Sequence, residues 1–290
     1  MRVSLPPHVV SHAREFAEGR RTPAEPRDAA TVVLMRPGRF AGSGPELYLL
    51  SRQTSMAFAG GMCVFPGGSV DRRDFDNTVA WSGPAPATWA ARLRTSEEMA
   101  QALVCAAVRE TFEESGVLLA GPSAAEVVAD TTADDWEADR RALETRELAF
   151  TELLDRRGLV LRSDLLGAWA AWCTPEFEPR RFRTWFLVDA LPSGELISVA
   201  SRESSSVSWM SALRACDAAD ADQLAMMPPT YLTCLEVGQY GDPDAVLAAA
   251  DGRDLAMFTP TVEDDGDSPT MTVPERVSPL LEARGDRARA

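Results

Sequence analysis

The chain has 290 residues, of which 45% are hydrophobic and 25% are charged, and its formal net charge is −15 at pH 7. This length can bury the core of one large or two small domains. All of its basic residues are arginines, and an acidic chain without basic tracts is not expected to bind nucleic acid.

The cysteines and the apolar segments bear on compartment and partners. The five cysteines have no C-x-x-C spacing, which does not match the usual zinc-site pattern and favours reduced thiols. The N-terminus has no apolar signal core, and no apolar run approaches membrane-spanning length. We therefore expect a cytoplasmic protein without membrane contact. A homodimer is the protein assembly that we keep open.

The first part of the chain is predicted to hold an extension, three strands and a glycine-rich turn. Residues 1–30 form the N-terminal extension, with a short helix from Val9 to Ala17. The third strand runs directly into the turn Phe65-Pro66-Gly67-Gly68. Runs of β-branched and apolar residues place the three strands at 31–36, 47–52 and 62–65.

An insertion at 69–96 separates this turn from a long helix. Ser96, followed by two glutamates, has the pattern of a helix N-cap, and the helix is predicted to continue to Ser115. Gly116 then suits a C-terminal stop in the left-handed conformation. The apolar residues of this helix fall on one face, beside an acidic edge.

The rest of the chain contains helices and strands without an internal repeat. Residues 123–166 are predicted as a second, helical insertion. The expected strands lie at 117–119, 168–174, 182–188 and 207–210, and the expected helices at 211–215, 228–237 and 243–250. A turn at 191–194 and a hairpin of 257–262 and 270–273 around a solvated acidic turn complete the prediction.

Three carboxylates lie close together near the end of the long helix. Glu110, Glu113 and Glu114 are spaced i, i+3 and i+4, so they share one helix face. Like charges at this spacing destabilise a helix, and the helix dipole disfavours anions in the last turn. A hard divalent cation such as Mg²⁺ or Mn²⁺ removes the conflict, because it prefers carboxylate oxygens. The alternative interpretation is a solvated acidic helix end.

Together with the glycine turn, this stretch resembles the signature of the Nudix hydrolase family, G-x5-E-x7-R-E-U-x-E-E-x-G-U, in which U is aliphatic. Gly68 matches the first glycine, and the run from Arg109 to Val117 matches the second half, except that Thr111 replaces an aliphatic residue. The distance from Gly68 to Arg109 is 27 residues longer than in the family. Counting back eight positions from Arg109 places Gln101 where the family has a glutamate.

The resemblance implies a fold and a domain organisation. Nudix proteins belong to the α/β class and have a mixed β-sheet sandwiched between helices (α/β/α), with the signature forming a loop–helix–loop. We therefore expect a Nudix domain at 31–256 with helical insertions at 69–96 and 123–166, followed by a C-terminal hairpin and tail at 257–290.

The resemblance also implies a reaction. The family hydrolyses a nucleoside diphosphate linked to another moiety, using Mg²⁺ or Mn²⁺. The residues expected to hold the metal are Gly67, through its carbonyl, and Glu110, Glu113 and Glu114. One of the three glutamates could act instead as the general base. Arg109 is expected to orient the glutamates through charge-assisted hydrogen bonds. Candidates for a further carboxylate ligand are Glu176, Glu178 and Glu203. Glu203 is favoured, because it precedes a strand containing Trp209, as in similar family members.

Fewer sequence features indicate the substrate than indicate the reaction. Leu49-Leu50-Ser51-Arg52, followed by Gly61 and F-P-G-G, is similar to the stretch before the signature in Nudix coenzyme A diphosphatases. An interrupted signature is a feature of the acyl-CoA branch. Arg52 is one candidate for binding phosphate, and Arg181 and Arg183 are two more, because alternate strand residues share a face. ADP-ribose, NAD(H), dinucleoside polyphosphates and nucleoside triphosphates are alternative substrates, and a non-hydrolytic nucleotide sensor is the alternative class of function.

Overall fold

The computed structural model describes residues 7–40, 42–54, 59–191, 204–263 and 270–287. Within these ranges, seven strands form one mixed sheet, in which the successive neighbours are β10, β2, β1, β9 and β8, with β3 beside β2 and β4 beside β1. β1 and β9 are parallel, and the other neighbours are antiparallel. The strands are β1 (Arg27–Arg36), β2 (Glu46–Arg52), β3 (Cys63–Val64), β4 (Gly67–Ser69), β8 (Gly167–Cys173), β9 (Phe182–Ala190) and β10 (Ser204–Ser211).

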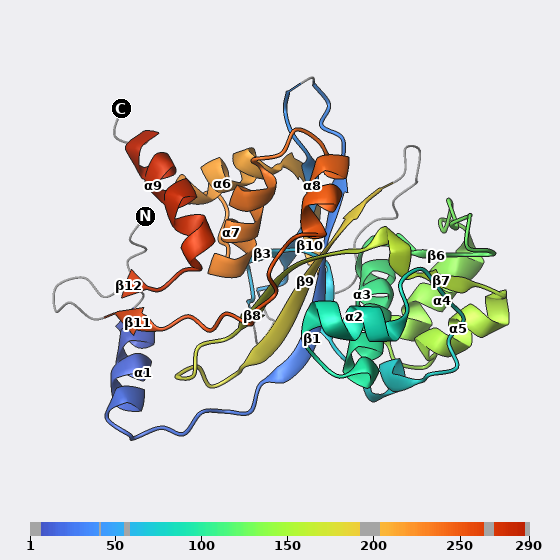
Figure 1. Cartoon of the computed structure of the whole chain (residues 1–290), viewed down its shortest axis with the longest axis horizontal. Coiled ribbons are helices and arrows are strands. Elements are labelled where there is room, and N and C mark those ends of the chain that lie inside the picture. The colour runs from blue at the N-terminus through green and yellow to red at the C-terminus, as the bar shows by residue number, and fades with distance from the viewer. Residues whose placement is uncertain (1–6, 41, 55–58, 192–203, 264–269, 288–290) are drawn as a thin grey trace.

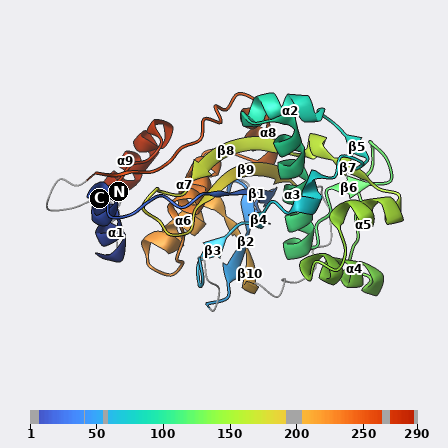
Figure 2. The same ribbon diagram turned by 90° about the horizontal axis from the view of Figure 1, so that it is seen from below.

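Helices cover both faces of this sheet, as Figures 1 and 2 show. Side chains alternate along a strand, and β1 therefore contributes Val32 and Leu34 to one core and Val33 and Met35 to the other. The first core includes α2 (Pro86–Leu93) and α3 (Glu97–Ser115), and the second includes α6 (Ala212–Asp220), α7 (Pro228–Val237) and α8 (Pro243–Ala250). The expected α/β/α arrangement is confirmed.

The two insertions meet in a small second sheet. β5 (Trp81–Ser82), from the first insertion, pairs with β7 (Val160–Arg162), from the second, and β7 also pairs with β6 (Ala120–Gly121). The second insertion also contains α4 (Asp134–Glu144) and α5 (Phe150–Arg157), which lie beside α3 at the end of the molecule opposite α1 (Pro7–Ala17). The smaller elements are η1 (Arg72–Phe75), η2 (Ser163–Leu165), β11 (Val262–Glu263), β12 (Thr270–Met271), η3 (Glu275–Val277) and α9 (Ser278–Arg287).

Several predicted elements have different limits in the structure. The strand predicted at 117–119 is wrong, because Val117, Leu118 and Leu119 are buried in the core while strand pairing begins at Ala120. The strand predicted at 31–36 begins earlier, at Arg27. Near the C-terminus, Phe258 hydrogen-bonds the edge strand β8, and the hairpin is reduced to β11 and β12. The turn predicted at 191–194 and the acidic turn of the hairpin lie mostly outside the described residues.

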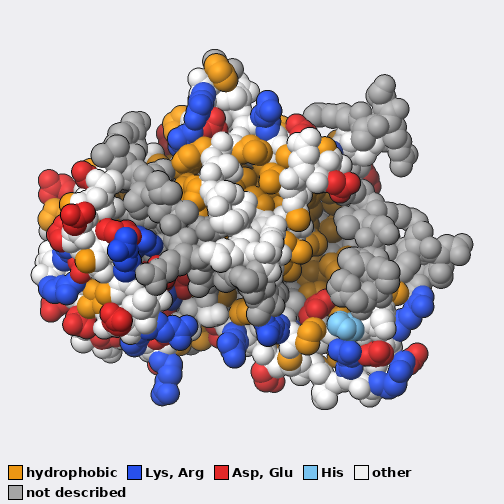
Figure 3. Space-filling model, turned by 180° about the vertical axis from the view of Figure 1, so that it is seen from behind, with side chains coloured by type: hydrophobic (Ala, Val, Ile, Leu, Met, Phe, Trp, Pro, Cys, Tyr) orange, Lys and Arg blue, Asp and Glu red, His pale blue; other side chains and the backbone are white. Residues whose placement is uncertain are grey.

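Hydrophobic side chains reach part of the surface formed by the described residues. The face drawn in Figure 3 has hydrophobic side chains grouped near its centre and charged side chains around the periphery. Among the described residues, Phe40, on the segment that joins β1 to β2, is the one large hydrophobic side chain that is mainly exposed. In the described part of the chain, no helix combines the length and the hydropathy needed to cross a membrane.

Candidate functional site

The helix α3 has the limits that its sequence predicts. The Ser96 side chain accepts a hydrogen bond from the Met99 N–H at 3.2 Å, which caps the first turn. At the other end, Gly116 has φ 76°, and its N–H donates to the Phe112 carbonyl. This left-handed residue ends the helix directly after the turn that carries the three glutamates.

The glycine turn fits tightly between β1 and α3. A Cβ atom on Gly67 would lie 2.5 Å from the Ala30 carbonyl oxygen, and one on Gly68 would lie 2.4 Å from Oε1 of Glu110. The Gly67 N–H donates to Oε2 of Glu114 at 2.8 Å. Two glycines are therefore needed to bring this backbone against the glutamates of α3.

Arg109 organises the carboxylates. Its Nε and Nη2 donate to the two oxygens of Asp74 at 3.0 and 2.9 Å, and its Nη1 donates to Glu110 at 2.7 Å and to Glu113 at 3.1 Å. Nη2 also donates to the Ser69 carbonyl at 3.2 Å. Burial opposes the charge of the guanidinium, but the neighbouring carboxylates outweigh it and raise the pKa of Arg109.

Asp74 is a member of this cluster that the sequence analysis missed. It is 2% exposed and lies on η1, where it also accepts the Asp71 N–H in a reciprocal capping box. Asp74 stands six positions after Gly68, which is the spacing of the first glutamate in G-x5-E. Counting forward from the glycine would have found it, because the extra residues follow this position.

The assignment of Gln101 to the place of the family glutamate is therefore wrong. The Gln101 amide donates to the Asp76 carbonyl at 3.3 Å. Eight residues of helix span about 12 Å, so Gln101 lies two turns away from Arg109. Counting back from Arg109 fails, because the insertion interrupts the signature between its first acid and its arginine.

Glu113 has an electrostatic environment that disfavours its charged form. Burial is the main cause, the negative charge of Glu110 is the second, and Arg109 compensates only in part, so the pKa of Glu113 is raised to about 7. Three carboxylates, those of Asp74, Glu110 and Glu113, pair with the one guanidinium of Arg109, and Glu114 adds a fourth in the same turn. The cluster therefore has an excess of negative charge that a cation would neutralise.

The donor set fits a hard divalent cation in its chemistry, since it consists of carboxylate oxygens beside backbone groups. Within the described residues, no three acidic, histidine or cysteine side chains are already arranged as a metal cage. Glu110 and Glu113 instead accept hydrogen bonds from Arg109, and Glu114 accepts one from Gly67. The contact that Gly67 makes is through its N–H, and its carbonyl as a metal ligand remains a prediction.

Two of the three arginines predicted to bind phosphate make hydrogen bonds to other groups of the protein. Arg181 is buried and donates to the carbonyls of Ala24 and Thr174, and Arg183 donates to both oxygens of Asp28 at 2.7 and 3.0 Å. These contacts favour structural roles. Arg52 ends β2 opposite Ser204, at the start of β10, and its role remains a prediction. Glu203 lies outside the described residues.

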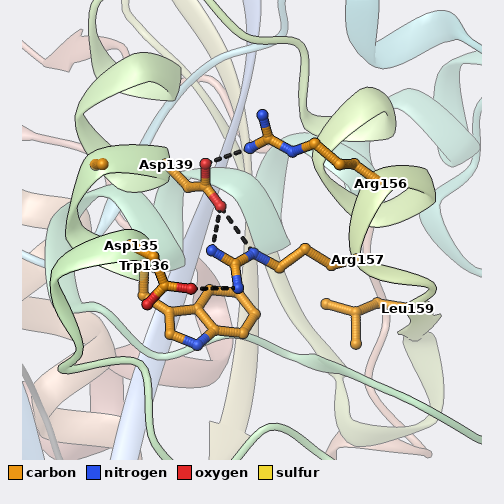
Figure 4. A pocket seen from close by; sticks show the side chains of 7 residues that line it. Asp135, Trp136, Asp139, Arg156, Arg157 and Leu159 are labelled. Atoms are coloured by element: carbon orange, nitrogen blue, oxygen red, sulfur yellow. Dashed lines mark hydrogen bonds and ion pairs between the residues drawn. The ribbon is translucent and has the colours of Figure 1, made fainter.

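A cavity of about 570 Å³ lies between α4 and α5, lined by Trp136, Asp139, Arg157 and their neighbours. Figure 4 shows Asp139 between Arg156 and Arg157, and Arg157 also donates to Asp135. The Arg157 guanidinium stacks on Trp136 at 3.7 Å. The opposite charges are paired with one another, so these contacts join the two helices, and none of the glutamates of α3 lines the cavity.

Comparison with known proteins gives consistent results. The family model described as the NUDT19 Nudix domain matches residues 82–236. A protein of Caenorhabditis elegans named "Putative nudix hydrolase 7" is 26% identical over 75% of this chain and 62% of its own length. "Acyl-coenzyme A diphosphatase NUDT19" of Gallus gallus is 27% identical over 71% of this chain and 66% of its own length. The chain thus spans somewhat less than two thirds of these relatives.

A solved structure supports the fold. The NUDIX hydrolase from Alicyclobacillus acidocaldarius superposes with a TM-score of 0.66 at 24% sequence identity, covering 80% of this chain and 99% of that one. The fold is therefore shared over four fifths of this chain.

Proposed function

Because the chain belongs to the Nudix hydrolase family, we propose that it is a metal-dependent pyrophosphohydrolase that cleaves a nucleoside diphosphate linked to a second moiety. The observation that carries this proposal is the bidentate pair of Arg109 with Asp74. That pair joins the two separated halves of the signature and holds the glutamates of α3 against the glycine turn.

The residues around the turn have two kinds of role, binding the metal and positioning its ligands. Glu110, Glu113 and Glu114 would hold Mg²⁺ or Mn²⁺, which, when bound, neutralises diphosphate oxygens and lowers the pKa of a water molecule. Arg109 keeps two of these carboxylates in place, and the Gly67 N–H keeps the third. Thr111, which departs from the family pattern, donates to the Ala107 carbonyl at 2.8 Å inside the helix, so its hydroxyl is satisfied and leaves the turn undisturbed.

For the substrate we propose CoA or an acyl-CoA. The stretch from Leu49 to Gly68 and the interrupted signature favour this class, and the chicken relative is named an acyl-coenzyme A diphosphatase. Hydrolysis at the diphosphate would yield adenosine 3′,5′-bisphosphate and a phosphopantetheine product. The Asp74–Arg109 pair also explains how a signature with 27 additional residues can still form one site.

A substrate panel tests the proposal. CoA, acetyl-CoA, ADP-ribose, NADH, a dinucleoside polyphosphate and ATP are compared at equal concentration with Mg²⁺ or Mn²⁺, and products are identified by mass. We expect the CoA compounds to be cleaved fastest, with all activity lost in EDTA and restored by added metal. A rate with ADP-ribose or NADH about tenfold above that with CoA would contradict the substrate class. Nucleotide binding without hydrolysis of any compound would contradict the enzymatic function.

A further inference from the structure

Side chains from other elements donate hydrogen bonds to the backbone carbonyls at the C-terminal end of α3. The last carbonyls of a helix have no partner within it. Beyond the bond to Phe112 made by Gly116, the Glu113 carbonyl accepts from Nη1 of Arg140 at 2.6 Å, and the Gly116 carbonyl accepts from the Thr131 hydroxyl at 2.5 Å. The Glu114 carbonyl accepts from the Tyr48 hydroxyl at 3.3 Å. The backbone of the turn with the glutamates is thus held from outside the helix.

Arg140 is fixed before it reaches this turn. Its Nε and Nη2 donate to the two oxygens of Glu137 at 2.7 and 2.8 Å, and the residue is 5% exposed. The planar guanidinium makes bidentate contacts of this kind at low cost in conformational freedom. The remaining nitrogen, Nη1, then meets the Glu113 carbonyl. A cation at this place also offsets the negative end of the helix dipole, where the glutamates are least favourable.

The insertion that carries Arg140 is itself packed on the same turn. The Trp136 ring of α4 meets the Phe112 ring of α3 edge to face, with centroids 6.1 Å apart. α4 is also joined to α5 by the ion pairs of Asp139 with Arg156 and Arg157, which Figure 4 shows. α4 thus contacts the end of α3 through both Trp136 and Arg140, which lets Arg140 hold the turn in one position.

We propose that Arg140 and Thr131 are positioning residues for the hydrolysis proposed above, on which this inference rests. They bind the backbone at Glu113 and Gly116, on either side of Glu114, and so keep the carboxylates directed at the glycine turn. In this chain the helical insertion is therefore part of what makes the metal-binding turn competent.

The chain provides a matched control for each residue. Arg141 also binds Glu137, at 2.8 Å, but its side chain is 59% exposed and its partner lies on its own helix, α4. Thr132, next to Thr131, is exposed, and its hydroxyl donates to Asp130 at 2.6 Å. The test compares Arg140→Gln with Arg141→Gln and Thr131→Val with Thr132→Val in the full chain.

Three experiments are made on each variant: calorimetry for the Mn²⁺ dissociation constant, a melting curve in EDTA, and steady-state kinetics for kcat and KM with CoA. We expect Arg140→Gln and Thr131→Val to weaken Mn²⁺ binding by about tenfold, the usual effect of losing a residue that orients a metal ligand. kcat should fall with them. Arg140→Lys should recover part of the loss, because it keeps a charged donor, and both controls should stay within about twofold of wild type.

The outcomes separate this inference from the proposed function. Variants that fold but bind Mn²⁺ as tightly as their controls would overturn the positioning role, as would a lower melting temperature with unchanged Mn²⁺ affinity. If Arg140→Gln does not fold, the nearly isosteric Thr131→Val decides. Wild-type protein that binds no Mn²⁺ would instead contradict the proposed function, together with the inference built on it.

Discussion

Asp74 orients the guanidinium of Arg109. Its negative charge can be removed by a substitution that hardly changes the shape of the side chain. Asp74→Asn keeps one acceptor oxygen for Arg109 but loses the charge and the bidentate geometry. We expect kcat with CoA to fall by about tenfold to a hundredfold, and the free energy of unfolding to fall by roughly 1–3 kcal/mol. Asp76→Asn is the control, because the side chain of Asp76 binds Thr78 outside the cluster. Equal activity of the two variants would remove Asp74 from the site.

Gln101 provides the complementary test. Gln101→Glu restores the residue type of the family signature at a position that the structure places two turns away from Arg109, beside the Asp76 carbonyl. We expect kcat and KM within about twofold of wild type and a slight loss of stability, since a carboxylate cannot donate to that carbonyl. A large gain in activity would show that the signature is completed by Gln101 after all.

The last turn of α3 concentrates the negative charge of the site, and its removal should separate activity from stability. Glu114→Gln keeps an oxygen that can accept the Gly67 N–H but lacks the anionic oxygen that a hard metal prefers. A loss of about 4 kcal/mol in transition-state stabilisation would lower the rate about a thousandfold. The melting temperature in EDTA should stay level or rise slightly, because repulsion in the turn is relieved. Near-normal turnover would return the turn to the interpretation of a solvated acidic helix end.

The same turn should make metal-free stability depend on pH. The pKa of the Glu113 carboxyl is raised from 4.5 to about 7, first by burial and then by Glu110. The folded protein therefore binds this proton more tightly than the unfolded chain does. The free energy of unfolding in EDTA should fall by roughly 1–3 kcal/mol as the pH rises from about 4.5 to about 7, and be level in this contribution above that. Denaturant titrations of Glu113→Gln should lack this component, and an unchanged slope would assign it to other groups.

For the whole molecule, metal binding should raise the free energy of unfolding. A ligand that binds only the folded state raises the free energy of unfolding in proportion to the logarithm of its concentration. We expect the melting temperature of the wild type to rise by several degrees with saturating Mn²⁺, and that of Glu114→Gln to change much less. Ca²⁺ at the same concentration is the control for a general effect of divalent charge. An equal rise in both proteins would place the stabilising metal away from α3.

Local signals allowed much of the fold to be predicted. Ser96 and Gly116 mark the ends of α3, and Pro228 and Pro243 mark the starts of α7 and α8, because caps and prolines act within a few residues. The run at 117–119 misled, since apolar residues indicate burial but do not show whether a strand partner is available.

The candidate site was predictable only where its residues are adjacent in sequence. The glutamate spacing identified the turn, and the glycines identified its partner. Asp74 was recoverable by counting forward from Gly68, but Arg140 and Thr131 were not, because their contacts with α3 depend on how an insertion packs. Arg181 is the opposite case. It belongs to a basic cluster in the sequence, which suggested phosphate binding, but in the fold its guanidinium donates to backbone carbonyls.

The pair of Asp74 with Arg109 also bears on how such a signature can be interrupted during evolution. The pair closes a loop of 34 residues, where the uninterrupted family signature has 7. Loop-closure entropy grows only with the logarithm of length, so this extension costs about 1.4 kcal/mol. The first insertion recovers part of that cost by forming α2 and by pairing β5 with β7. The interval between the acid and the arginine is thus a place where an ancestral gene could accept new sequence while the ends of the loop stayed in contact.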